Sequence, residues 1–124
     1  MTTEFMSLTR GDTDEDLPSH RAQVEWLIST FKRYAAGCAF APGDLITPRA
    51  DSNLEGAGLP HIVLDVVAPD QAKPRMTGDP NDASFGARID VRYARLVSAP
   101  AGETMVIAFW EESWKFEPYR GPTA

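Results

Sequence analysis

Residues 104–111 read TMVIAFWE, and this run decides the fold of the chain. Successive side chains of a strand point to opposite faces of a sheet. Here the apolar side chains would alternate between the two faces as Met105, Ile107 and Phe109 on one and Val106, Ala108 and Trp110 on the other. A strand that is apolar on both faces needs cover on both. The run therefore predicts a strand that lies between two layers.

Other segments on either side of this run also have the pattern of strands. Residues 88–97 alternate between apolar and charged side chains, and residues 61–67 are rich in branched ones. A Pro-Gly turn leads into a short strand at 44–47, and a last short strand would turn Trp114 and Phe116 inward. Because hairpin-like turns separate the strands, we expect about five, mostly antiparallel, in a small curled sheet.

The segment before the strands has the period of a helix. Its apolar stripe consists of Val24, Leu27, Ile28, Phe31 and Ala35. The helix is expected to begin near Pro18 or Ser19 and to end at Gly37. It is the one spare element that can cover the second face of the 104–111 strand, so residues 19–36 are predicted to lie across the sheet. The fold class is then α+β, mainly β, with an N-terminal amphipathic helix packed on the sheet.

Charge divides the chain into a tail and a domain. The formal net charge is -6, and residues 1–17 hold five acids against one arginine, so -4 of that charge belongs to them. We expect an acidic flexible tail over 1–17, a single helix-plus-barrel domain over 18–119 and a C-terminal tail over 120–124. The acidic tail is interpreted as solubilising. The alternative is a docking arm with three apolar anchors, which are Phe5, Met6 and Leu8.

Composition excludes several classes of protein. A negative average charge opposes binding to nucleic acid, because contacts with phosphates supply most of that affinity. Cys38 is the only cysteine, which rules out an intramolecular disulfide and a zinc site built from thiolates. No apolar run approaches the length of a membrane span, and the N-terminus lacks the pattern of a signal peptide. We expect a cytoplasmic protein with no cofactor, no metal and no membrane partner.

The run Phe40-Ala41-Pro42-Gly43-Asp44-Leu45-Ile46 resembles the opening of SH3-like small β-barrels, where F-x-x-G-D-hydrophobic leads into the first strand. The aromatic pair Trp114 and Phe116 is similar to the closing strands of short bacterial and phage proteins of that kind. The likeness covers about residues 40–119. It implies a half-open barrel and brings no catalytic residue with it.

Two side chains are candidates for chemistry. His61 begins a strand beside loop glycines, and with Asp44, Asp65 or Glu111 it would act as a general base or a metal ligand. The alternative is a structural histidine, and no histidine spacing typical of a metal site is present. Cys38 would need a partnering base to act as a nucleophile, so it is interpreted as a small buried hydrophobe.

Aromatic residues give the strongest indication of a function. Tryptophan, tyrosine and arginine are enriched at the energetic centres of interfaces, although in a small domain most aromatic residues belong to the core. The candidate binding residues are Trp110, Trp114, Arg88, Arg92 and His61.

No combination of residues in the sequence points to catalysis. The sequence favours a non-enzymatic binding module that uses the barrel face and the irregular segment 68–86 to hold a protein partner or a second copy of itself. Two alternatives remain open: a small enzyme that uses His61 with a nearby carboxylate, and an acidic mimic of nucleic acid.

Overall fold

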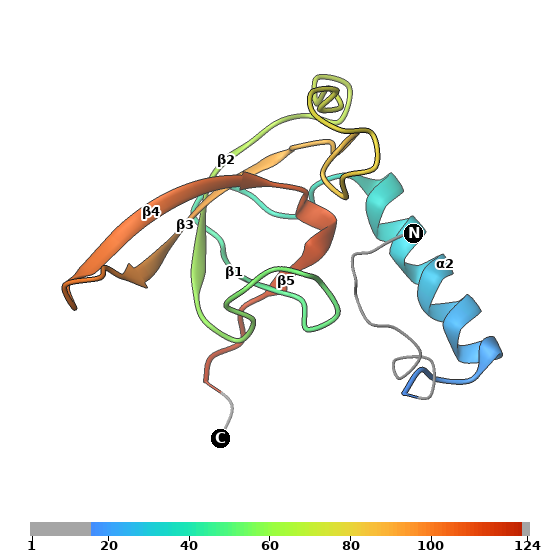
Figure 1. Ribbon diagram of the computed structural model, residues 1–124, viewed down its shortest axis with the longest axis horizontal. Coiled ribbons are helices and arrows are strands. Elements are labelled where there is room, and N and C mark those ends of the chain that lie inside the picture. Colours follow the sequence, from blue (N-terminus) through green and yellow to red (C-terminus); the bar gives the residue numbers. More distant parts are fainter. Residues whose placement is uncertain (1–15, 123–124) are drawn as a thin grey trace. The chain divides into compact units, whose positions relative to one another are not determined.

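A computed structural model describes residues 16–122 of the chain. The predicted docking anchors Phe5, Met6 and Leu8, and nearly all of the predicted acidic tail, lie outside the described residues. The elements, in chain order, are α2 (His20–Ala36), β1 (Leu45–Pro48), β2 (His61–Val66), β3 (Val91–Ser98), β4 (Thr104–Glu111), the 3-10 helix η1 (Ser113–Lys115) and β5 (Phe116–Pro118) (Figure 1). The chain divides after Arg33 into two compact units.

Helix α2 begins and ends where the sequence predicts. The Ser19 hydroxyl accepts a hydrogen bond from the Ala22 N–H at 3.2 Å, which satisfies one of the free amides of the first turn. Gly37 follows the helix with a φ of 78°, a conformation that glycine adopts without strain. No residue of α2 is buried, and the predicted docking of its apolar stripe on the sheet stays a prediction.

The five strands form one open antiparallel sheet, which confirms the predicted fold class. Their order is β4-β3-β2-β1-β5, so the last strand pairs with the first. Strands β3 and β4 form a long curved hairpin (Figure 1). Gly102, with a φ of 90°, closes this hairpin: its N–H donates to the Ala99 carbonyl at 2.8 Å, and the Ala99 N–H donates to the Glu103 carbonyl at 2.6 Å. This is the three-residue hairpin loop with one left-handed residue.

One face of the sheet carries the core, and we call it the inner face. The buried side chains that pack together there are Ile46, Val63, Val91, Tyr93 and Phe116. Residues directly opposite one another in antiparallel strands point to the same side. The other side, the outer face, therefore contains the row Leu45, Ile62, Ala94 and Ala108, which the register aligns across four strands.

The structure corrects three details of the predicted strands. Strand β3 begins at Val91, so Arg88 precedes the strand and instead forms an isolated bridge with Pro74. Trp114 belongs to η1, because the Ser113 N–H and hydroxyl both donate to the Asp90 carboxylate and turn the chain at this point. Strand β1 is shifted by one residue, and its last position is Pro48.

Strand β4 has the predicted bounds, but its surroundings differ from those expected. None of its residues is buried, and Val106 is 70% exposed. The sequence predicts that other residues cover both faces of β4. The strands and loops of the second compact unit, which contains the sheet, do not provide this cover. Among residues 16–122, β4 is an edge strand that pairs with β3 alone, and both of its apolar faces are at least partly exposed.

Candidate functional site

Two of the predicted binding residues meet on the outer face. Arg92 on β3 lies directly opposite Trp110 on β4, and the Arg92 guanidinium carbon is 5.9 Å from the centre of the Trp110 ring. A cation at this distance is attracted to the face of the ring. Trp110 is nevertheless 42% exposed, so the pair presents an aromatic surface and a positive charge to solvent.

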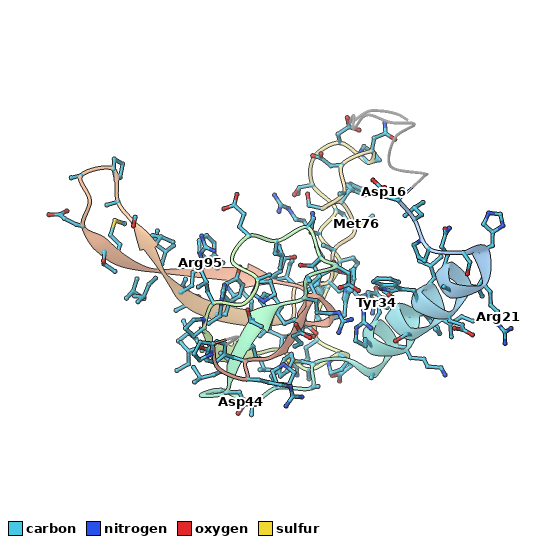
Figure 2. The ribbon with its side chains drawn as sticks, turned by 90° about the horizontal axis from the view of Figure 1, so that it is seen from below. Asp16, Arg21, Tyr34, Asp44, Met76 and Arg95 are labelled. Carbon is cyan, nitrogen blue, oxygen red and sulfur yellow. The ribbon has the colours of Figure 1, made fainter. Side chains whose placement is uncertain are left out.

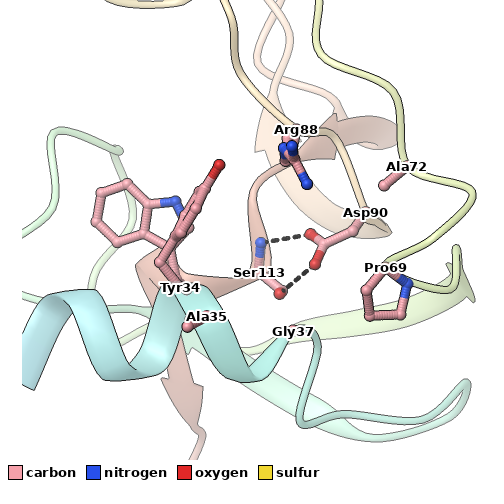
Figure 3. A pocket seen from close by; sticks show the side chains of 9 residues that line it. Tyr34, Ala35, Gly37, Pro69, Ala72, Arg88, Asp90 and Ser113 are labelled. Atoms are coloured by element: carbon pink, nitrogen blue, oxygen red, sulfur yellow. Dashed lines mark hydrogen bonds between the residues drawn. The ribbon is translucent and has the colours of Figure 1, made fainter.

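Two further predicted residues, Arg88 and Trp114, line a cavity of about 120 Å³ (Figure 3). The complete lining is Tyr34, Ala35, Gly37, Pro69, Ala72, Arg88, Asp90, Ser113 and Trp114. The rings of Tyr34 and Trp114 meet edge to face, with their centres 6.5 Å apart. The cavity therefore combines an aromatic wall with one cationic and one anionic side chain.

Hydrogen bonding in this cavity serves the structure of the turn. The Ser113 N–H and hydroxyl each donate to one oxygen of the Asp90 carboxylate, and both distances are 2.7 Å (Figure 3). Both oxygens of the Asp90 carboxylate accept from Ser113, so this pair holds the start of η1 in place.

A larger cavity of about 320 Å³ joins Trp110 to the 68–86 segment. It is lined by Asn53, Leu54, Arg75, Asp82, Ala83, Ser84, Ala87, Ile89, Trp110, Glu111 and Lys115. The segment has no regular strand or helix, as the sequence predicts, and exposed Met76 lies on it (Figure 2). A hydrogen bond joins two distant parts of this segment: the Gly86 N–H donates to the Arg75 carbonyl at 2.6 Å. The volume of this cavity lies at the lower end of the range of small-molecule sites, and the cavity is large enough to admit a side chain.

Two charged residues next to or within η1, Glu112 and Lys115, were not predicted as site residues. Glu112 is only 8% exposed and accepts a hydrogen bond from the Arg88 N–H at 2.9 Å. Lys115 forms ion pairs with Glu111 at 3.1 Å and with Glu112 at 3.7 Å, and its ammonium lies 5.5 Å from the Trp114 ring centre. Adjacent carboxylates such as Glu111 and Glu112 are typical of exposed turns, so their pattern does not predict this arrangement.

His61 is placed as a structural residue of the core. It is 2% exposed, with its ring 5.4 Å from Tyr93 and 6.3 Å from Phe116, measured between ring centres. Its Nδ1 lies 2.8 Å from the Leu59 carbonyl, and a carbonyl only accepts, so Nδ1 carries the proton of the neutral ring. Burial, together with the nearby charge of Arg95 on β3 (Figure 2), lowers the pKa of His61.

The structure does not bring His61 together with its predicted partners. No carboxylate of the described residues forms a hydrogen bond or an ion pair with its ring, whose Nε2 has no hydrogen-bond partner among these residues. This geometry supports the interpretation of His61 as a structural residue, because its ring is not paired with a carboxylate as a general base would be.

Cys38 is likewise part of the packing. Its thiol donates a weak hydrogen bond to the Phe40 carbonyl at 3.6 Å, the side chain packs against the core, and burial raises the pKa of the thiol. A raised pKa disfavours the thiolate that a nucleophile needs. Among residues 16–122, no group of three or more His, Cys, Asp or Glu side chains is placed to hold a metal ion.

Comparison of the chain with family models, curated proteins and solved structures found no match. Within the part of the chain that the structure describes, no helix has the length and apolar character needed to cross a bilayer. A function for the protein therefore has to be inferred from the surfaces and cavities described above.

Proposed function

We propose that this protein is a small binding module without catalytic activity, which engages a protein partner or a second copy of itself through the outer face of its sheet. One observation carries the proposal: the outer face holds an exposed group of large apolar side chains. They are Leu45, Ile62, Leu96, Val106 and Trp110. Contiguous apolar patches of this kind mark interaction surfaces on soluble proteins.

The strand register makes this group contiguous. Leu45 lies opposite Ile62 on the neighbouring strand, and Leu96 lies opposite Val106. Directly opposite residues of antiparallel strands have neighbouring side chains, so each pair forms a block of apolar surface. The two blocks lie on the same side of one sheet. Ala94 on β3 and Ala108 on β4 continue the row of Leu45 and Ile62, and so connect it to Leu96 and Val106 on the same two strands.

One end of this surface carries the residue types that interfaces use most. Arg92 and Trp110 stand together at one end, and tryptophan and arginine are the residues most enriched among binding hot spots. The cavity beside Trp110 adds a recess into which a partner can insert a side chain. These features support a protein partner, with the 68–86 segment at the rim.

The other hypotheses have less support. An enzyme that uses His61 would need access to the ring and a base partner, and the ring is buried beside Arg95. The acidic mimic of nucleic acid depends mainly on residues 1–17, nearly all of which lie outside the described residues. The pairing of β5 with β1 supports the proposal that the fold is SH3-like, and a cytoplasmic location is proposed from the sequence.

A substitution on the outer face tests the proposed function. We expect Val106→Lys to weaken binding to the partner, or to itself, at least about tenfold, which is the effect of losing a hot spot. The matched control is Leu59→Lys, because Leu59 is also exposed but lies in a loop outside the sheet. Light scattering of the purified chain measures self-association, and affinity capture from the native source followed by titration measures a partner.

Two results would oppose the proposal. Equal loss of binding in both variants would place the interaction elsewhere on the molecule. A wild-type chain that stays monomeric at high concentration and retains no protein in capture would remove the basis for a binding module.

A further inference from the structure

The two edges of the sheet are protected to very different degrees. Strand β5 is three residues long, carries Glu117 and ends in Pro118, and each of these features discourages another strand from pairing there. Strand β4 is eight residues long and contains no proline, and its only charged residue is Glu111 at the end. A long uncharged edge of this kind is a template for pairing with another chain.

The hairpin fixes which backbone groups of β4 face outward. The Ala99 N–H donates to the Glu103 carbonyl, so these residues form a hydrogen-bonded pair. Such pairs alternate with unbonded ones along an antiparallel ladder. In the register of β3 and β4, the N–H and carbonyl groups of Val106 and Ala108 therefore point away from β3. Within the described residues β4 pairs with β3 alone, which leaves these groups at the free edge.

We propose that this edge pairs with β4 of a second copy of the chain, in antiparallel orientation, so that two sheets join into one. The inference rests on the proposed binding function, specifies the partner as a second copy, and adds a second surface, the free edge of β4 beside the outer face, through which the two copies pair. Pairing also gives the apolar side chains on both faces of β4 lateral neighbours, because the added strand contributes side chains to each face of the joined sheet.

A second copy fits this edge in both backbone pairing and charge. An antiparallel pair of identical strands has two-fold symmetry, so each outward donor meets an acceptor of the same strand in the other copy. With Ala108 facing its own copy, Val106 of one chain lies opposite Trp110 of the other. Ile107 then lies opposite Phe109, and no like charges face each other, since Thr104–Trp110 is uncharged.

Hydrogen exchange of the full wild-type chain tests the pairing directly. We expect the amide protons of Val106 and Ala108 to exchange at least about tenfold more slowly at high protein concentration than on dilution, because pairing gives them acceptors. The amides of Ile107 and Phe109 already point toward β3, and they are the internal control. Exchange at Val106 and Ala108 that is fast and independent of concentration would overturn the proposal.

Two variants separate edge pairing from stacking of the outer faces. Ala108→Pro removes an outward N–H and spares the bonds to β3, so it is expected to make the chain monomeric in sedimentation and light scattering. Leu96→Lys changes the side chain opposite Val106 on the same face but leaves the edge intact, so it is expected to remain dimeric. Circular dichroism verifies that each variant is folded.

The outcomes keep the two proposals apart. A dimer lost in Leu96→Lys but kept in Ala108→Pro would overturn edge pairing and leave the binding function of the outer face in place. A monomeric wild-type chain that captures a partner, and loses it in Val106→Lys, would likewise contradict only the edge proposal. A chain that binds neither itself nor a partner would contradict both.

Discussion

His61 is a polar side chain in the core, and its titration makes the stability of the protein depend on pH. Burial lowers its pKa below the ordinary value of 6.5, so the unfolded chain takes up a proton at a higher pH than the folded one. The contribution of His61 to stability is therefore complete above pH 6.5. It is lost progressively as the pH falls from 6.5 toward the lower folded-state pKa, with a limiting slope of about 1.4 kcal/mol per pH unit.

Urea unfolding on both sides of pH 6.5 measures this effect, with His61→Leu as the comparison. Carboxylates titrate in both proteins, so the difference between the two curves isolates the imidazole. We expect the free energy of unfolding of the parent to fall more steeply below pH 6.5 than that of the variant. Parallel curves would show that His61 is protonated as readily in the folded state as in the unfolded one.

Gly56 supports the same part of the core. A Cβ at this position would lie 2.6 Å from Nη1 of Arg95 and 3.2 Å from Cε1 of His61. Gly58 has the same φ of 91°, but a Cβ there would meet nothing within 4 Å. Both alanine variants carry the backbone strain, and only Gly56→Ala adds crowding. We expect thermal or urea unfolding to show Gly56→Ala as the less stable by about 1–3 kcal/mol; equal losses would mean that Arg95 simply moves aside.

At the scale of elements, the sequence predicted what depends on local pattern. The period of the stripe and the residues Ser19 and Gly37 placed α2, and the alternation of residues 104–111 placed β4. The predicted start of β3 and the predicted strand at Trp114 were wrong. Both depend on the hydrogen bonds between Asp90 and Ser113, which lie 23 positions apart in the chain. Spacing along a sequence carries no signal for such a contact.

The candidate site shows the same limit. The pairing of Arg92 with Trp110 follows from two alternating strands joined by a short turn, so it was open to prediction in principle. The burial of Glu112 and its ion pair with Lys115 depend on how η1 folds back. The sequence left both a catalytic and a structural role open for His61, and its position in the core comes from long-range packing against Tyr93 and Phe116.

The contact between Asp90 and Ser113 can be tested as the bond that holds η1. In Asp90→Asn an amide group replaces one acceptor oxygen and faces a Ser113 donor, so a buried hydrogen bond is lost at a cost of about 1–3 kcal/mol. Asp65→Asn is the control, because that carboxylate accepts one N–H, from its neighbour Val66, at an exposed site. Urea unfolding should rank Asp90→Asn well below Asp65→Asn; equal stability would deny the contact a role.

The whole molecule adds an electrostatic condition to self-association. Each chain carries a net charge of -6, so pairing through β4 would bring two negative chains together. Salt screens this repulsion over a Debye length of about 8–10 Å at moderate ionic strength. The segment Thr104–Trp110 of β4 is uncharged, so pairing through it adds no ion pair for salt to weaken. We therefore expect the dissociation constant of the dimer to fall roughly several-fold as salt rises from low to moderate concentration.

Sedimentation equilibrium across a salt series measures this dependence. The control neutralises the acidic run in the full chain, as Asp12→Asn, Asp14→Asn, Glu15→Gln and Asp16→Asn, which removes most of the net charge without touching the sheet. This variant should associate more tightly at low salt and respond less to added salt, because less repulsion remains to be screened. A dimer that salt dissociates would instead be held by ion pairs, and β4, uncharged from Thr104 to Trp110, supplies none.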